Sequence, residues 1–270
     1  MAVLGLEQRA ADALRSIVDQ YAAGEAEVVR AYFAIPRTTE ENVDVLLRQM
    51  GRELQTASWL HGAIRMLDDL EVSVDRHDFA EFLEQIAEET EHYCILADLA
   101  EWAAGHKLGR DELRQYEVYA RWEPDAPPEK RANAKLPEGN RMLQIAHELV
   151  QVLGQERGTR LVRVSEGGGG GAFIECARLN GDPFRDRLGV AMRRILKDEI
   201  HHGPERVDIF ARDWVRSDED LAASTRWLRV FMAQHLRVRN EIWCYPLSIE
   251  RLEAIDQGRI APFDPAIDLS

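Results

Sequence analysis

The chain has 270 residues, of which 45% are hydrophobic and 30% charged, and its formal net charge is -14. This charge disfavours binding to nucleic acid or to an anionic membrane surface. No apolar run reaches the ~18 residues of a membrane span. The N-terminus lacks the apolar core of a signal peptide. Three cysteines, far apart and without a CxxC pair, argue against a disulfide framework, so we expect a cytoplasmic protein.

The hydrophobic pattern is helical throughout and predicts an all-α fold. In chain order, helices are expected at about 6–34, 39–70, 75–105, 109–122, 140–180, 183–215 and 218–244. Pro124, Pro127, Pro128 and Pro137 predict a loop, because proline is unfavourable inside a helix. The tail from Pro246 is expected to be irregular. No alternation of strands and helices is present.

Two five-residue motifs, called words here, follow the same pattern. Residues 88–92 read Glu-Glu-Thr-Glu-His and residues 198–202 read Asp-Glu-Ile-His-His, so each is an acid, a Glu, two residues and a His. On a helix, a Glu and a His three residues apart project from the same face. Each word can therefore offer a metal one carboxylate oxygen and one imidazole nitrogen.

To complete a two-metal site in a helical bundle, each word needs a further carboxylate on a neighbouring helix at the same height along the bundle axis. The turn before the first word falls near Glu71; Glu53 lies 18 residues before it and Glu89 lies 18 after. Residues equally far from the turn of an antiparallel hairpin lie at the same height, since each residue rises by the same amount. Glu53 also lies within an apolar stripe, where a carboxylate is costly unless it is paired or binds metal. The other residues of this stripe are Leu46, Met50, Ala57, Leu60 and Ile64.

The second word has a matching partner. Glu166 lies 16 residues before the turn near Asp182, and Glu199 lies 17 after it. Glu175 is 9 residues beyond Glu166, about 13 Å along a helix axis, and is therefore too near the turn. The remaining histidines are expected to be surface or satisfied core residues: His61, His77, His106, His147 and His235.

Five consecutive glycines follow Glu166. Glycine disfavours a helix by about 0.8–1 kcal/mol per residue, so some function should offset this run. The favoured interpretation is a helix that leaves room for dioxygen and substrate. A phosphate-cradling loop after a strand at 160–164 and a flexible loop are the alternatives. The expected substrate-pocket residues are Gly167, Gly168, Gly169, Gly170 and Phe173.

The two words are similar to the D/E-E-x-R-H words of acyl-carrier-protein desaturases and bacterial multicomponent monooxygenases. The chain thus resembles the ferritin-like superfamily of diiron carboxylate proteins over about residues 20–215. The resemblance implies a four-helix bundle core at about 40–215, inside a single domain at 1–245 with a tail at 246–270. The implied metal ligands are Glu53, Glu89, His92, Glu166, Glu199 and His202.

In this pattern Glu89 and Glu199 bridge two iron ions. The leading acids Glu88 and Asp198 hydrogen-bond the ligand histidine of the opposite word, and His201 supports the site or faces substrate. The family's Arg before His is absent, and Gly replaces its Thr near the third ligand. The means of proton delivery and the substrate class are therefore not transferred.

The function expected from these residues is a non-haem diiron oxidase or oxygenase. Such an enzyme uses dioxygen to hydroxylate, desaturate or N-oxygenate a small or carrier-bound organic substrate. Hard carboxylate and imidazole ligands suit iron, with manganese as the other option. An electron-donor protein should be separate, because the chain carries no CxxC or flavin motif, and a homodimer is expected. The alternatives are a ferroxidase or iron-handling protein, a manganese or peroxide-scavenging protein, and a metal-free helical interaction protein.

Overall fold

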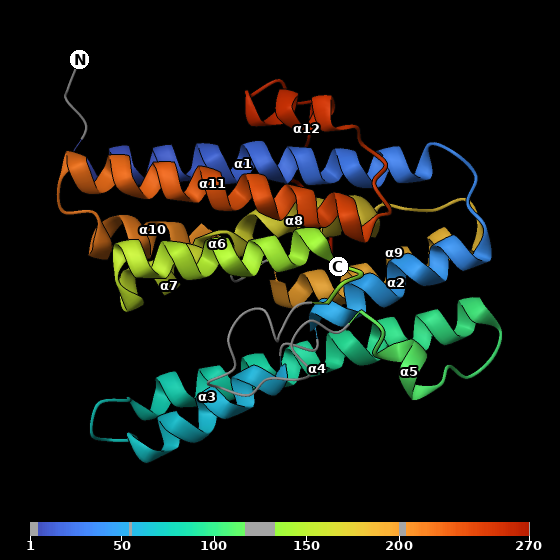
Figure 1. The fold of residues 1–270 in the computed structure, drawn as a ribbon, viewed down its shortest axis with the longest axis horizontal. Coiled ribbons are helices and arrows are strands. Elements are labelled where there is room, and N and C mark those ends of the chain that lie inside the picture. The colour runs from blue at the N-terminus through green and yellow to red at the C-terminus, as the bar shows by residue number, and fades with distance from the viewer. Residues whose placement is uncertain (1–4, 54–55, 117–132, 200–203, 270) are drawn as a thin grey trace. The chain divides into compact units, whose positions relative to one another are not determined.

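The structure is a computed structural model that describes residues 5–53, 56–116, 133–199 and 204–269. At 56–59, 61, 166–169 and 204 it describes the backbone alone. These residues form 12 helices and no strand, with one isolated bridge between Leu70 and Val74 (Figure 1). The predicted all-α fold is confirmed. None of the described helices has the length and apolar character needed to cross a membrane.

The chain divides into two compact units. One comprises residues 37–140 and is called here the α4 unit; the other comprises 1–36 with 141–270 and is called the α1 unit. The prediction of one ferritin-like domain at 1–245 stays a prediction. Each unit is described below by itself.

The α4 unit is a helical hairpin followed by a short helix. Its helices are α2 (Thr39–Glu53), α3 (Thr56–Asp68), α4 (Arg76–Ala104) and α5 (Arg110–Leu113). α4 contacts both α2 and α3. Thr38 and Glu41 exchange side-chain hydrogen bonds with each other's backbone N–H, which is a capping box at the start of α2. Asp75 caps α4, and Gly105 ends it in the left-handed conformation with φ 75°.

The α1 unit is built around its longest helix. Its helices are α1 (Leu6–Phe33), α6 (Pro137–Leu153), α7 (Gln155–Val164), α8 (Glu166–Ala177), α9 (Pro183–Glu199), α10 (Pro204–Trp214), α11 (Asp218–Ile242) and α12 (Ile249–Asp256). α6 begins in the α4 unit and continues into this one. α1 contacts α8, α10, α11 and α12, and α8 also contacts α9. Because neighbouring helices cover several faces of α1, half of its residues are buried.

A close approach between α1 and α8 explains one of the five glycines. A Cβ atom added at Gly171 would lie 1.9 Å from the carbonyl oxygen of Ala22. No side chain fits in that space, so glycine is required for the two helices to meet. At Gly170 the same test finds no heavy atom within 4 Å.

One predicted helix is broken within the described residues. The expected helix at 140–180 is three helices, separated at Gly154, whose φ is 88°, and at Ser165. The described parts of the expected helices at 39–70 and 183–215 are helical as α2 and α3 and as α9 and α10, and residues 54–55 and 200–203 lie outside the described part of the chain. Of the helix expected at 109–122, the described residues form only the four of α5.

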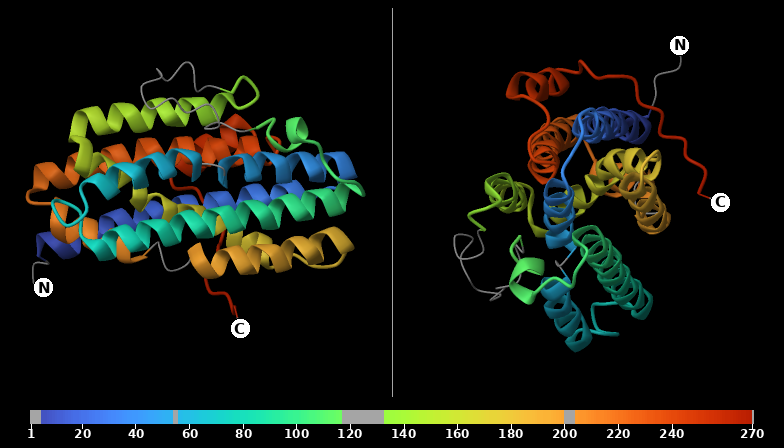
Figure 2. Two further views of the ribbon diagram at one scale, coloured as in Figure 1. Left: turned by 90° about the horizontal axis from the view of Figure 1, so that it is seen from below. Right: turned by 90° about the vertical axis from the view of Figure 1, so that its right-hand side faces the viewer.

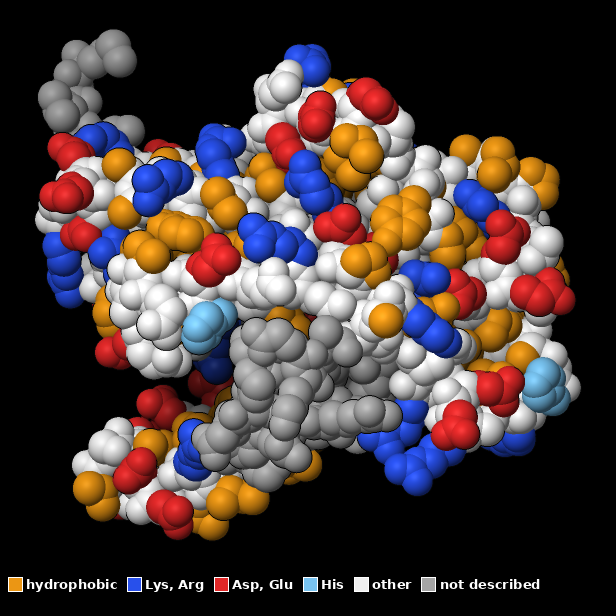
Figure 3. Space-filling view, viewed as in Figure 1, with side chains coloured by type: hydrophobic (Ala, Val, Ile, Leu, Met, Phe, Trp, Pro, Cys, Tyr) orange, Lys and Arg blue, Asp and Glu red, His pale blue; other side chains and the backbone are white. Residues whose placement is uncertain are grey.

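The predicted apolar stripe around Glu53 does not continue into α3. Leu46 and Met50 on α2 are buried, whereas Leu60 and Ile64 on α3 are more than half exposed. On the face drawn in Figure 3, apolar side chains are interspersed with acidic and basic ones. The stripe therefore predicted burial correctly only up to Glu53.

The C-terminal tail is less irregular than predicted. Residues 249–256 form α12, which is capped by the Ser248 hydroxyl, so an irregular tail from 246 onward is wrong for this segment. The remaining described residues form no helix after Asp256. This segment passes α1 and the α8–α9 pair (Figure 2, right). Arg178 holds it there by donating to the backbone oxygens of Asp264 and Ala266, at 2.7 Å each.

Candidate metal centre

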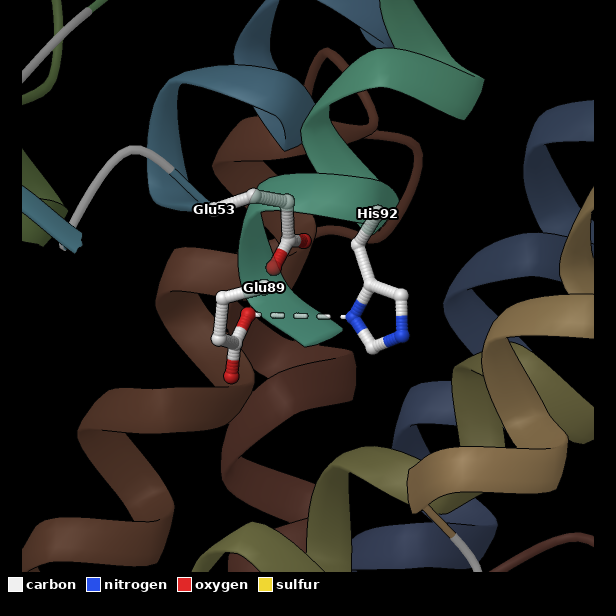
Figure 4. Close-up of side chains that lie close together, drawn as sticks. All are labelled: Glu53, Glu89 and His92. Atoms are coloured by element: carbon white, nitrogen blue, oxygen red, sulfur yellow. Dashed lines mark ion pairs between the residues drawn. The ribbon is translucent and has the colours of Figure 1, made fainter. Parts of the chain in front are cut away.

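Three of the predicted metal ligands lie together in the α4 unit. Glu53 ends α2, and Glu89 and His92 come from the middle of α4. One ligand atom from each of the three lies within 4.8 Å of the others. Figure 4 shows the two carboxyl groups and the imidazole turned toward one another. Glu53 and His92 are buried, with exposed fractions of 8% and 1%.

The hairpin between α3 and α4 brings the two helices into register. Glu71 has φ 62° and its N–H donates to the carbonyl of Val74, at 2.9 Å. This tight turn lies midway between Glu53 and Glu89 in the sequence. The predicted equal height of these two residues is confirmed by the proximity of their carboxyl groups.

Burial and a second carboxyl group determine the protonation of Glu53. Loss of solvent, followed by the charge of Glu89 and a hydrogen bond with it, raises the Glu53 pKa to about 8; His92 and Gln49 act in the opposite direction. Gln49 donates from Nε2 to Glu53 Oε1 at 2.5 Å. Without a cation, this carboxyl group therefore holds a proton near neutral pH.

The imidazole of His92 faces the carboxylate on its own helix. His92 Nδ1 lies 3.7 Å from Glu89 Oε2, one helical turn away (dashed line in Figure 4). A buried ring held beside two carboxyl groups is in a suitable place to coordinate a cation through nitrogen.

The three side chains fit a metal ion by donor type and by charge. Two carboxyl groups in contact repel each other unless a proton or a cation lies between them. Carboxylate oxygens with an imidazole nitrogen suit manganese, iron or zinc. The raised Glu53 pKa reflects this repulsion together with burial, and a bound cation would relieve the repulsion as a proton does.

The other predicted ligands belong to the α1 unit. Glu199 is the last residue of α9 and is half-buried. Glu166 is the first residue of α8, described by its backbone alone. His201 and His202 lie outside the described residues. Glu88 on α4 and Asp198 on α9 are half-buried.

Glu175, which the spacing argument rejected as a ligand, has cationic partners in the structure. Arg30 Nη1 lies 3.0 Å from Glu175 Oε2, and Arg178 lies 3.9 Å from the same oxygen. Its carboxylate is therefore used in contacts between α1 and α8.

The glycine run is helical, as the favoured interpretation predicted. All five glycines lie inside α8, and Arg160–Val164 lies inside the helix α7 instead of a strand. The phosphate-cradling and flexible-loop alternatives are therefore wrong. Gly170 and Gly171 line a cavity of about 710 Å³ in the α1 unit, and Glu199 lines it too. Phe173, expected in the pocket, packs against the Arg239 guanidinium at 5.2 Å and is absent from the lining.

The sequence did not predict two groups of residues: the one beside the metal-ligand candidates and the one in the cavity lining. Gln49 could have been found, because it precedes Glu53 by one helical turn and shares its buried face. Asp19 and Arg15 line the cavity from α1. Nothing in the α1 sequence marks them, since their importance arises only from contacts made by distant segments.

The lone histidines outside the two words agree with their predicted roles where their side chains are described. His77, His106 and His147 are exposed. His235 is buried, with Nδ1 2.6 Å from Glu25 Oε1, while Arg239 Nε donates to Glu25 Oε2 at 3.0 Å. This buried charged group joins α1 to α11. The side chain of His61 lies outside the described part of the chain.

Comparison of the chain with models of protein families, with curated proteins and with solved structures finds no match.

Proposed function

We propose that the chain is a metal-dependent oxidase whose metal centre includes Glu53, Glu89 and His92. The observation that carries the proposal is the contact between the buried Glu53 carboxyl group and the half-buried Glu89 carboxyl group, beside the buried imidazole of His92. A protein keeps two acids together in a poorly solvated place at a considerable cost in stability. Binding a cation removes that cost, and this provides a functional reason for the arrangement.

Iron is the proposed metal, with manganese as the alternative. The donor set is hard and anionic, which suits both ions. The second Glu-x-x-His word, with Glu199 and His202, supports a two-iron centre by its sequence alone. Bound ferrous iron would supply electrons to dioxygen, and a separate protein would restore them.

The protein residues around the metal have distinct roles in this proposal. Glu53 would hold the metal as a deprotonated carboxylate, and Gln49 orients that carboxyl group through the hydrogen bond to Oε1. The buried ring of His92 offers a nitrogen that water reaches poorly. Glu89 contributes the second carboxylate from the same helix as His92.

Oxidation of an organic substrate is favoured over iron storage by the α1-unit cavity. Its walls are mainly apolar, and they include Glu199 and Gly170, which the sequence assigned to the metal site and to the substrate pocket. A storage protein has no need of an apolar cavity of about 710 Å³, a size typical of small-molecule sites.

Dioxygen uptake tests the proposal. The protein is loaded with Fe(II) without oxygen, mixed with dioxygen in the presence of a chemical reductant, and followed with an oxygen electrode. We expect repeated uptake by the wild type and by Glu84→Ala, an exposed control on the same helix. Uptake should fall at least about tenfold in Glu89→Ala, because a ligand is lost.

Two other results would contradict the oxidase proposal. Iron accumulation far beyond two ions per chain, with uptake limited to the iron supplied, would indicate iron handling. Equal uptake by wild type and Glu89→Ala would place dioxygen chemistry elsewhere or show that there is none.

A further inference from the structure

The cavity in the α1 unit has walls from segments that are distant in the sequence. α1, α8, α9 and α10 form its sides, and the C-terminal segment at 260–265 covers it. Val18, Ile174, Leu196 and Val207 are buried apolar side chains in these walls. The volume of about 710 Å³ lies within the range of pockets that enclose a small molecule.

Among the described residues, three ionisable side chains interrupt the apolar lining: Arg15, Asp19 and Glu199. Arg15 already pairs with Asp208 on α10 and lies 3.6 Å from Asp12. Its positive charge is therefore balanced outside the cavity. Asp19 is one helical turn further along α1 and is exposed to solvent where it lines the cavity. Its partial burial raises the Asp19 pKa, and the charge of Arg15 acts in the opposite direction.

Two of the three described ionisable side chains in the lining are acids, and the third, Arg15, is already paired with Asp208. A carboxylate or phosphate ligand would face Asp19 and Glu199, with Arg15 engaged by other acids. A cationic group would instead find a carboxylate partner beside an apolar surface. The described charges therefore favour a cationic head group over anionic lipids and over acyl chains with a free carboxylate.

We propose that this cavity binds a small apolar molecule carrying a protonated amine, with its apolar part against α8 and α9 and its ammonium group beside Asp19. As a statement about the substrate class, the inference rests on the proposed oxidase function. As a statement about binding, it stands on the cavity and its charges alone.

A matched ligand series tests the inference. Octylamine, 1-octanol and octanoate have the same chain length and differ in the charge of the head group. Their affinities are measured by calorimetry on the full chain, first without metal and then after loading with Fe(II). We expect octylamine to bind best and octanoate worst in both states.

Two variants separate the head-group contact from the apolar contact. Asp19→Asn should weaken octylamine about fivefold and leave 1-octanol unchanged, because only the ion pair is lost. Glu7→Gln removes an acid from an exposed position of α1 outside the cavity and should change neither affinity. Gly170→Leu should weaken all three ligands, because its side chain would occupy open space in the cavity.

Octanoate binding as tightly as octylamine, or no binding by any ligand, would overturn the inference. An octylamine affinity that does not respond to Asp19→Asn would do so as well. These results leave the metal centre untouched, since dioxygen uptake and its dependence on Glu89 are measured separately. Conversely, amine binding without dioxygen uptake would support the cavity assignment and contradict the oxidase.

Discussion

Glu53 and Glu89 lie 18 residues on either side of Glu71, and their carboxyl groups share a hydrogen bond between α2 and α4. Such a bond requires a proton on one of the two groups. The proton is present at neutral pH because burial and the neighbouring acid raise the Glu53 pKa to about 8. This relationship leads to two predictions about the metal-free protein and its response to metal.

The stability of the metal-free protein should depend on the protonation of Glu53. Its pKa is raised from 4.5 to about 8, so the folded state binds more protons than the unfolded state between these values. The contribution of Glu53 to stability therefore falls as pH rises through this window, by at most about 1.4 kcal/mol per pH unit. Urea unfolding with a chelator present, at pH 5 to 8, measures it.

Glu53→Gln is the matched variant for this measurement, because it keeps the shape of the side chain and cannot ionise. Its stability relative to the wild type should increase steadily from pH 5 to pH 8. Parallel stability curves for the two proteins would show that Glu53 does not hold a raised pKa.

Metal binding should release the Glu53 proton. At pH 7 we expect the wild type to release about one proton more per metal than Glu53→Gln, because the ligand must be deprotonated. At pH 9 the difference should disappear, since the group is already ionised. Calorimetry in two buffers with different ionisation enthalpies counts the protons, and equal release at pH 7 would contradict the assignment.

The glycine run offers a matched pair for the α1–α8 contact. Gly171→Ala should destabilise the protein by about 1–3 kcal/mol, because the new Cβ would lie 1.9 Å from the Ala22 carbonyl oxygen. Gly170→Ala meets no heavy atom within 4 Å and should stabilise it by about 0.5–1 kcal/mol. Thermal unfolding of both variants measures the contrast; equal effects would mean that the helices do not meet at Gly171.

The fully buried ion group between α1 and α11 should matter more than a partly exposed pair made by the same helix. Glu25→Ala should cost about 3–5 kcal/mol, because it leaves Arg239 buried without its carboxylate. Glu27→Ala removes the partner of Arg251, 2.6 Å away in a pair whose side chains are 18% and 31% exposed, and should cost about 1 kcal/mol. Denaturant unfolding distinguishes the two; similar losses would contradict the buried network.

The sequence predicted those features that depend on regular spacing. The α4 hairpin was found because Asp75 and Gly105 are strong start and end signals and because the spacing about Glu71 is symmetrical. Burial of Glu53 followed from the apolar period around it. The same apolar period wrongly predicted burial of Leu60 and Ile64, which are exposed on α3. The local sequence does not show that no other described segment packs over these two side chains.

Other features depend on contacts between distant segments. The break at Gly154 was not predicted, because a single glycine is compatible with a continuous helical pattern. The cavity needs α1, three later helices and the C-terminal segment, so the place of Asp19 in its lining could not be inferred locally. Arg239 was not paired with Glu25 for the same reason: 214 residues separate them.

Anaerobic Fe(II) binding, followed by equilibrium dialysis of the wild type, His92→Ala and Glu84→Ala, tests the central claim most directly. The account predicts about two irons per wild-type chain, the same number for the exposed control Glu84→Ala, and the loss of at least one iron in His92→Ala. Iron binding that is absent from the wild type, or unchanged in His92→Ala, would contradict a metal centre at Glu53, Glu89 and His92.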